Sequence, residues 1–279
     1  MQIVNTGLKV PILMYHEVAD ESEIDLLSRL TQHGYIVLRR EFRAQMEFLA
    51  TAGFTSISLD QLWRWVDHDT PLPHKPIVIT FDDGFAGNHR WALPILNDLG
   101  LTATFFVVTN RIGDPHMLTW QDLTEMCRHS MSIESHTANH PLLSTIGETR
   151  TREELTQSKL RIEDALGTKV RFLSLPNGDS NLHYVKIAQE VGYRGGCGSQ
   201  FGMNTRLTDR YFWHRIAIKQ TLPFASFCKL VAGQFDAMLY HAAKAAGKAI
   251  IARSLGKKTY DRLYNLAFGV QEQDKSRQP

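Results

Sequence analysis

One stretch of the chain most constrains its fold: a short apolar run, residues 76–81, that stops at Asp82-Asp83-Gly84. Such a run, bounded by turn residues, is typical of a buried strand in an α/β protein whose sheet is covered on both faces. Ligands of parallel-sheet proteins usually bind where such strands end. Because successive strand side chains point in opposite directions, we expect Asp82 and Asp83 to face different surroundings, one near a metal ion and one in contact with it. The alternative is a polar loop in which an aspartate caps a helix.

Strand-like and helix-like segments alternate along most of the chain. Apolar runs predict further strands at residues 10–15, 54–58, 102–108, 131–135, 170–175 and 192–196. Amphipathic segments predict helices at residues 41–52, 61–66, 91–99, 119–129, 149–166 and 184–191. This alternation indicates an α/β fold with a parallel sheet, either open or closed into a barrel.

The composition narrows the class of protein. The 279 residues suffice for one large domain or two small ones, and a net charge of +2 gives no indication of nucleic-acid binding. The three cysteines form no C-x-x-C pair, which argues against a disulfide scaffold and a zinc–thiolate site. Residues 1–9 lack the basic start and apolar stretch of a secretory signal, and no segment is apolar enough to span a bilayer. We therefore expect a cytoplasmic protein.

The composition changes near residue 224. Residues 224–279 contain nine Lys or Arg against four Asp or Glu, a net charge of +5, whereas the rest of the chain has a net charge of −3. Apolar residues at helical spacing predict a basic amphipathic helix, either packed on the domain or resting on an anionic membrane surface. We therefore predict a main domain at residues 1–223, a basic helical extension at 224–270 and a disordered tail at 271–279.

Two histidines follow another predicted strand end. His136 and His140 lie four residues apart, and on a helical turn this spacing puts both imidazoles on one face, where they can bind one metal ion. Two histidines and one aspartate with an open position make a hydrolytic metal site, in which the ion lowers the pKa of bound water. A second carboxylate could take the proton of that water. Such a site can attack an amide or ester carbonyl.

Taken together, these motifs resemble the polysaccharide deacetylase family, or carbohydrate esterase family four. Thr-Phe-Asp-Asp-Gly at 80–84 and Ser-His-Thr-Ala-Asn-His-Pro at 135–141 are similar in order and separation to its first two motifs. Leu-Pro-Asn-Gly at 175–178 resembles the third motif. Leu-Met-Tyr-His-Glu-Val at 13–18 resembles the start of the exopolysaccharide and poly-N-acetylglucosamine deacetylase branch, and the likeness covers about residues 10–220.

The resemblance implies a fold and a metal site. The fold would be a distorted barrel of the (β/α)7 type, which usually holds zinc or another divalent ion. Asp82 corresponds to the general base of the family. Asp83, His136 and His140 correspond to the metal ligands.

The resemblance also implies an oxyanion donor and a general acid. The backbone N–H of Asn177, which follows the motif-three Pro176, would help to bind the oxyanion. The histidine of Met-Tyr-His protonates the leaving amine in the exopolysaccharide branch, which implies this role for His16; a capping or packing histidine is the alternative. His214 is the second choice for the acid.

The chain departs from the family pattern at the arginine that usually accompanies the base, and it also lacks the late Leu-x-His motif that supplies the general acid in most of the family. The arginine that usually precedes the motif-three proline by two positions is Ser174 here, so the usual partner of the base is missing. Arg215 is the candidate replacement that would orient Asp82. The alternative is that Arg215 forms an ordinary surface ion pair.

The resemblance thus predicts a metal-dependent hydrolase that removes N-acetyl groups from amino sugars of a glycan, exopolysaccharide or glycolipid. Its cofactor would be a divalent metal, with zinc the first choice. The alternatives are hydrolysis of a small cyclic amide and a non-catalytic glycan-binding barrel. We expect no nucleic-acid partner, and a peripheral contact with the inner face of the membrane would involve the C-terminal helices.

Overall fold

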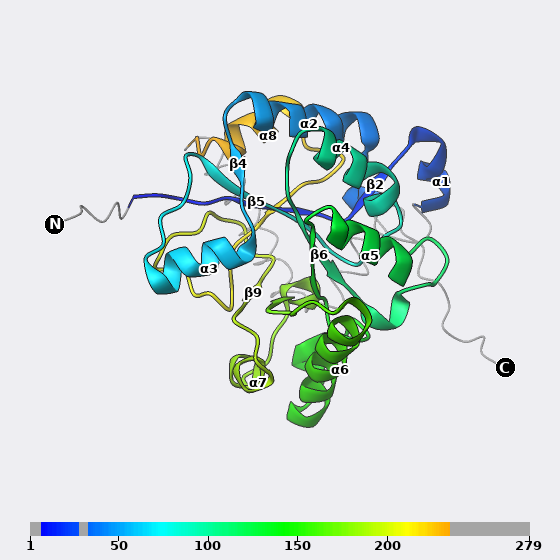
Figure 1. Ribbon diagram of the computed structural model, residues 1–279, viewed down its shortest axis with the longest axis vertical. Coiled ribbons are helices and arrows are strands. Elements are labelled where there is room, and N and C mark those ends of the chain that lie inside the picture. The colour runs from blue at the N-terminus through cyan, green and yellow to red at the C-terminus, as the bar shows by residue number, and fades with distance from the viewer. Residues whose placement is uncertain (1–6, 28–32, 235–279) are drawn as a thin grey trace, which may run out of the picture.

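The computed structural model describes residues 7–27 and 33–234, and its centre is a parallel sheet of eight strands (Figure 1). All strand pairs in this sheet are parallel. The strand order is β10 (Ile216–Ala217), β1 (Ile12–Tyr15), β5 (Pro76–Phe81), β6 (Thr104–Val107), β7 (Ser132–Ser135), β8 (Phe172–Ser174) and β9 (Gly195–Cys197), and β4 (Thr55–Ser56) pairs with the start of β5.

The two ends of the sheet approach each other. Trp213, which lies shortly before β10, donates its backbone N–H to Gly196 O over 3.0 Å. Gly198 N–H in turn donates to Trp213 O over 2.9 Å, and Cys197 forms an isolated parallel bridge with Trp213. The sheet is therefore curled into a distorted barrel, and the expected α/β fold of the (β/α)7 type is confirmed.

Helices lie outside the strands (Figure 1). They are α1 (Ile24–Leu27), α2 (Arg39–Thr51), α3 (Leu59–His68), α4 (Leu93–Asp98), α5 (Trp120–Arg128), α6 (Glu148–Leu166), α7 (Tyr184–Val191) and α8 (Phe224–Val231). Local sequence sets several ends: Ser58 and Thr119 begin α3 and α5 with capping boxes. Gly167 ends α6 in the left-handed conformation, with φ 65°.

Alternation along the strands separates two apolar layers. Residues of odd number in β5, such as Ile77 and Ile79, belong to the large cluster packed under the outer helices. Val78 belongs instead to a second cluster, which fills the inside of the curled sheet together with side chains of α3. The members of this second cluster are Val10, Ile12, Ile57, Leu59, Leu62, Trp65, Val78, Phe106, Phe172, Cys197 and Trp213.

Several elements differ from the sequence-based expectations. A second parallel sheet of two strands, β2 (Glu17–Ala19) and β3 (Ile36–Leu38), was not predicted, nor was β10. The helix expected at residues 91–99 is a π-helical turn, η3 (Asn88–Ala92), followed by α4. The 3-10 turns are η1 (Glu21–Glu23), η2 (His33–Tyr35), η4 (Thr109–Arg111), η5 (Leu143–Thr145) and η6 (Pro176–Gly178).

The C-terminal region is described only as far as residue 234. Within it, α8 packs on α2 through Phe227, whose ring centroid lies 6.3 Å from that of Phe48. The rest of the predicted extension 224–270 and the tail 271–279 lie outside the described residues, so the domain division stays a prediction. Over residues 7–27 and 33–234, the structure has no helix with the length and apolar character needed to cross a bilayer. The membrane contact and the cytoplasmic location also stay predictions.

Candidate active site

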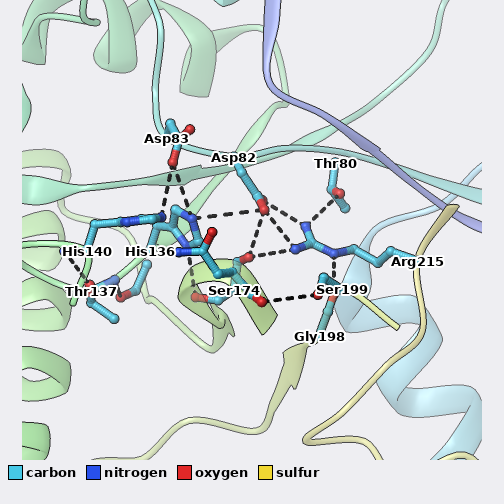
Figure 2. A network of polar contacts seen from close by, with 12 residues as sticks. Thr80, Asp82, Asp83, His136, Thr137, His140, Ser174, Gly198, Ser199 and Arg215 are labelled. Carbon is cyan, nitrogen blue, oxygen red and sulfur yellow. Dashed lines mark hydrogen bonds and ion pairs between the residues drawn. The ribbon is translucent and has the colours of Figure 1, made fainter. Parts of the chain in front are cut away.

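A polar layer lies above the apolar interior of the barrel, toward the ends of the strands. Thr80 and Asp82 follow Val78 at alternate positions along β5 and its end, so they point to the same inner side. Ser174 of β8 and Arg215, just before β10, reach the same place from across the barrel (Figure 2). This polar layer holds most of the side chains that the sequence nominated.

Asp82 lies in a buried ion pair with Arg215 (Figure 2). The guanidinium donates from Nη1 to Asp82 Oδ1 over 2.8 Å and from Nη2 to Oδ2 over 2.7 Å. Ser174 Oγ donates to Asp82 Oδ2 over 3.0 Å, and Arg215 Nε donates to Gly198 O over 2.7 Å. Arg215 is only 1% exposed, so this contact is not a surface ion pair.

Asp83 faces two imidazoles instead. Its Oδ1 lies 3.4 Å from His136 Nε2 and 3.5 Å from His140 Nε2. The two adjacent acids meet at His136, because Asp82 Oδ2 also lies 4.0 Å from His136 Nε2. The expected difference in surroundings is present, although it does not come from the strand pleat. Asp83 lies beyond the end of β5 in the left-handed region, with φ 73°.

The histidine pair is not on a helical turn, contrary to expectation. Residues 136–140 form an irregular turn in which Thr137 has φ 66° and His140 has φ 58°. Both residues have a Cβ, and L residues adopt this region rarely. The ring centroids of His136 and His140 still come within 4.7 Å of each other, so a different backbone path achieves the expected convergence.

The combined effects of burial and neighbouring charges lower the pKa values of Asp82, Asp83 and His140. They raise that of His136, because the Asp82 and Asp83 carboxylates outweigh the effect of its burial. Burial alone would raise the pKa of Asp82, but the Arg215 guanidinium outweighs it and holds this pKa below the ordinary value. Burial likewise opposes ionisation of Asp83, yet the hydrogen bond and charge of His136 lower its pKa. Burial lowers the pKa of His140 to about 4, with the His136 charge adding to the effect. Both acids are therefore carboxylates at neutral pH, and His140 is a neutral imidazole.

Asp83, His136 and His140 fit a divalent metal ion. Each offers one ligand atom, and the three atoms lie within 4.8 Å of one another. His136 Nδ1 lies 2.8 Å from the backbone oxygen of Ser174. A carbonyl oxygen can only accept a hydrogen bond, so Nδ1 carries a proton, and when the ring is neutral its lone pair is on Nε2, toward Asp83. One carboxylate and two imidazoles suit zinc and other first-row divalent ions.

His16 lies near this group at the end of β1. Burial lowers the pKa of His16, although the negative charges of Asp83 and Asp82 act in the other direction. Its ring centroid lies 4.2 Å from that of Tyr35, and its Nδ1 is buried with no hydrogen-bond partner among the described residues. Asn88 Nδ2 donates to the His16 backbone oxygen over 2.7 Å, which holds the backbone in place.

The remaining nominated residues occupy the rim. Pro176 is buried, whereas Asn177 is exposed and lies in the left-handed region with φ 54°; both belong to η6 beyond β8. Ser199 Oγ donates to Asn177 O over 3.3 Å. His214 is not brought into the cluster, since its side chain lies against Gly202 and its backbone exchanges hydrogen bonds with Asn204.

Two residues that contact the nominated side chains were not identified from the sequence. Ser174 was read only as a missing arginine, yet its hydroxyl contacts both Asp82 and Arg215. Tyr35 was not considered, although it packs on His16. Neither has a local motif: both contacts join segments far apart in the chain, and only the fold brings them together.

Comparisons with known proteins agree on one family. The family model described as polysaccharide deacetylase matches residues 69–196, which include Asp82, Asp83, His136 and His140. YxkH of Bacillus subtilis, a candidate polysaccharide deacetylase, is 29% identical over 219 residues, covering 78% of this chain and 75% of its own. The poly-β-1,6-N-acetyl-D-glucosamine N-deacetylase of Staphylococcus epidermidis is 24% identical over 225 residues, covering 74% of this chain and 78% of its own.

A solved structure agrees with this match. The Streptococcus pyogenes deacetylase PplD, solved in complex with acetate, superposes with a TM-score of 0.71 and 26% sequence identity. The superposition covers 77% of this chain and 94% of PplD. The similarity therefore extends over nearly the whole of that enzyme.

Proposed function

The chain carries a polysaccharide deacetylase domain, and from this premise we propose that it is a metal-dependent hydrolase that removes N-acetyl groups from amino sugars of a glycan. The observation that carries the proposal is the different pairing of two adjacent acids. Asp82 is paired with Arg215, whereas Asp83 converges with two histidines. The names of relatives that act on poly-N-acetylglucosamine and chitin support an N-acetylated glycan as the substrate class.

The metal would be held by Asp83, His136 and His140. When bound, a divalent ion supplies Lewis acidity, which polarises the acetyl carbonyl and makes water easier to deprotonate. The protein's own share at this point is to keep two of the three donors, Asp83 and His140, free of protons. The lowered pKa values of Asp83 and His140 do so at neutral pH.

Asp82 would act as the general base. Its carboxylate takes a proton from the water that attacks the acetyl carbon, and Arg215 and Ser174 hold both carboxylate oxygens in a fixed orientation. Arg215 is thus a positioning residue, and it takes the place of the arginine that the family usually carries at the position of Ser174. Asp82 lies 4.0 Å from His136 Nε2, which puts the base beside the metal ligands.

His16 would act as the general acid. As the C–N bond breaks, the proton that its imidazolium form carries passes to the leaving amine, and the products are acetate and a free amino sugar. The backbone N–H of Asn177, at the exposed rim, would donate to the oxyanion that forms before that bond breaks. These two roles are proposals from the motifs, supported by the place of both residues at the strand ends.

Acetate release tests the proposed function. The full chain, stripped of metal by a chelator and then reloaded with Zn²⁺, is incubated with β-1,4- and β-1,6-linked N-acetylglucosamine oligomers and with small linear and cyclic amides. We expect the reloaded protein to release acetate from the oligomers, the stripped protein to release almost none, and the small amides to remain intact.

Three results would count against the proposal. Hydrolysis of the small amides alone would favour a non-sugar amidase. A metal-loaded protein that binds the oligomers without releasing acetate would indicate a glycan-binding barrel. Equal release before and after metal removal would contradict metal dependence.

A further inference from the structure

The turn that carries His136 and His140 adopts a backbone conformation that its own residues do not favour. Thr137 and His140 both lie in the left-handed region, with φ 66° and 58°. Non-glycine residues remain there only when the surrounding structure holds them. The turn sets the distance between the two imidazoles, so whatever holds it also sets the metal site.

The backbone N–H groups of residues 137–140 in this turn donate to side chains instead of to backbone carbonyls. Thr137 N–H donates to Ser135 Oγ over 3.2 Å, and His140 N–H donates to Thr137 Oγ1 over 2.9 Å. The two N–H groups between them, those of Ala138 and Asn139, both donate to a single carboxylate oxygen, Glu154 Oε2, over 3.0 Å and 2.8 Å. Consecutive N–H groups that converge on one oxygen form an anion-binding nest, and here the anion belongs to the protein.

Glu154 comes from α6 and is 1% exposed. Its second oxygen, Oε1, accepts Asn139 Nδ2 over 2.8 Å and lies 3.1 Å from Arg150 Nη2 on the preceding turn of the same helix. Both oxygens therefore contact donors only. A carboxylate meets this requirement because it carries no hydrogen, whereas an amide would place an NH₂ group against one set of donors.

The other side of the turn is fixed by backbone contacts with η4. Thr109 N–H donates to Thr137 O over 3.3 Å, and Asn110 N–H donates to Ala138 O over 3.0 Å. These two bonds hold the carbonyl side, and Glu154 holds the N–H side. The turn is thus clamped between η4 and α6. Among the described residues, Glu154 is the one charged side chain that accepts hydrogen bonds from the N–H groups of the turn.

We propose that Glu154 is a positioning residue for the metal site: its buried carboxylate organises the turn so that His136 and His140 are set for one ion before that ion arrives. This inference rests on the proposed function, because it takes both histidines to be metal ligands. Glu154 does not contact the metal ligands' side chains. It acts through the backbone between them, as outer partners of metal ligands do.

The test compares metal affinity in Glu154→Gln and in a matched control, Glu153→Gln. Glu153 is the neighbouring residue of α6 and also pairs with Arg150, but it is exposed and forms no hydrogen bond with the turn among the described residues. Zn²⁺ affinity of the metal-free full chain is measured by competition with a fluorescent chelator. We expect Glu154→Gln to bind Zn²⁺ about 10–100-fold more weakly than the wild type, and Glu153→Gln to bind as the wild type does.

Amide hydrogen exchange supplies a second measurement that does not depend on how well the variant folds. In the metal-free wild type, the Ala138 and Asn139 amides should be protected even though they lie in a turn. Fast exchange at both would overturn the proposal, as would a Zn²⁺ affinity of folded Glu154→Gln within twofold of the wild type. Failure of the wild type itself to bind Zn²⁺ would instead overturn the proposed function, so the two failures are distinguishable.

Discussion

The side chains of Asp82 and Asp83 show how two identical, adjacent residues acquire different chemistry. Asp82 is buried among donors supplied by Arg215 and Ser174. Asp83 turns through a left-handed φ of 73° toward two imidazole nitrogens that have lone pairs to offer. The first arrangement favours proton transfer, and the second favours metal binding. Two neighbouring positions can therefore be tested separately.

Arg215→Met should change both stability and pH dependence. The substitution leaves the buried Asp82 carboxylate without its cation. Because removing one partner of a buried ion pair leaves an uncompensated charge, we expect the unfolding free energy to fall by about 3–5 kcal/mol. The pKa of Asp82 should rise, so the acidic limb of the kcat/KM profile should move to higher pH. The pH–rate profile and a denaturant titration measure the two effects.

The loss of stability in Arg215→Met should depend on pH in a defined direction. A carboxyl whose folded-state pKa is depressed stabilises the fold above its unfolded pKa, and this contribution is lost as pH falls through the folded value. The difference from the wild type should therefore be largest at neutral pH and shrink in acid. Arg194→Met, which removes a part-exposed pair with Asp60, is the control and should cost about 0–1 kcal/mol. An unmoved acidic limb in Arg215→Met would contradict the positioning role.

At the scale of elements, long and strongly patterned segments could be predicted from sequence, whereas several of the short ones could not. The strand β5 can be recognised in the sequence because both of its faces are buried, so all six of its residues are buried. In contrast, β2 and β3 have three residues each and β10 has two, too few to show a period. Ion pairs between distant residues are equally difficult to predict. Asp82 and Arg215 are 133 positions apart, and no local sequence pattern joins them.

The approach between β2 and the π-helical turn η3 depends on a single glycine. A Cβ added at Gly87 would overlap the Val18 backbone oxygen and the Glu17 carboxylate, and neither can move freely, since both are buried. We expect Gly87→Ala to cost about 1–3 kcal/mol of unfolding free energy, the usual range for overpacking.

Gly147→Ala provides the matched control for this test, because a Cβ at Gly147 meets nothing within 4 Å. Thermal denaturation of both variants and the wild type measures the effect. Equal melting temperatures for Gly87→Ala and Gly147→Ala would show that β2 and η3 are not packed as described.

At the scale of the whole molecule, the curled sheet explains why distant segments form one site. Parallel strands deliver all their carboxyl ends to one rim, so the residues that follow β1, β5, β7 and β8 converge without being close in sequence. Near-closure of the sheet then brings Arg215 against Asp82. The fold and the three candidate metal ligands could be recognised from motifs in the sequence. The contacts of Glu154 with the turn at 136–140 and the backbone conformation of that turn could not be predicted from the sequence, because both depend on tertiary contacts.

The most direct test of the account measures metal content and turnover together in Asp82→Asn and Asp83→Asn. Loss of a general base should lower kcat by about 10²–10⁴-fold in Asp82→Asn while the Zn²⁺ content stays at the wild-type level. Asp83→Asn should lose both metal and activity, and melting curves should show that both variants are folded at the assay temperature. Loss of metal from both variants, or near-normal turnover in Asp82→Asn, would contradict the division of roles between the two acids.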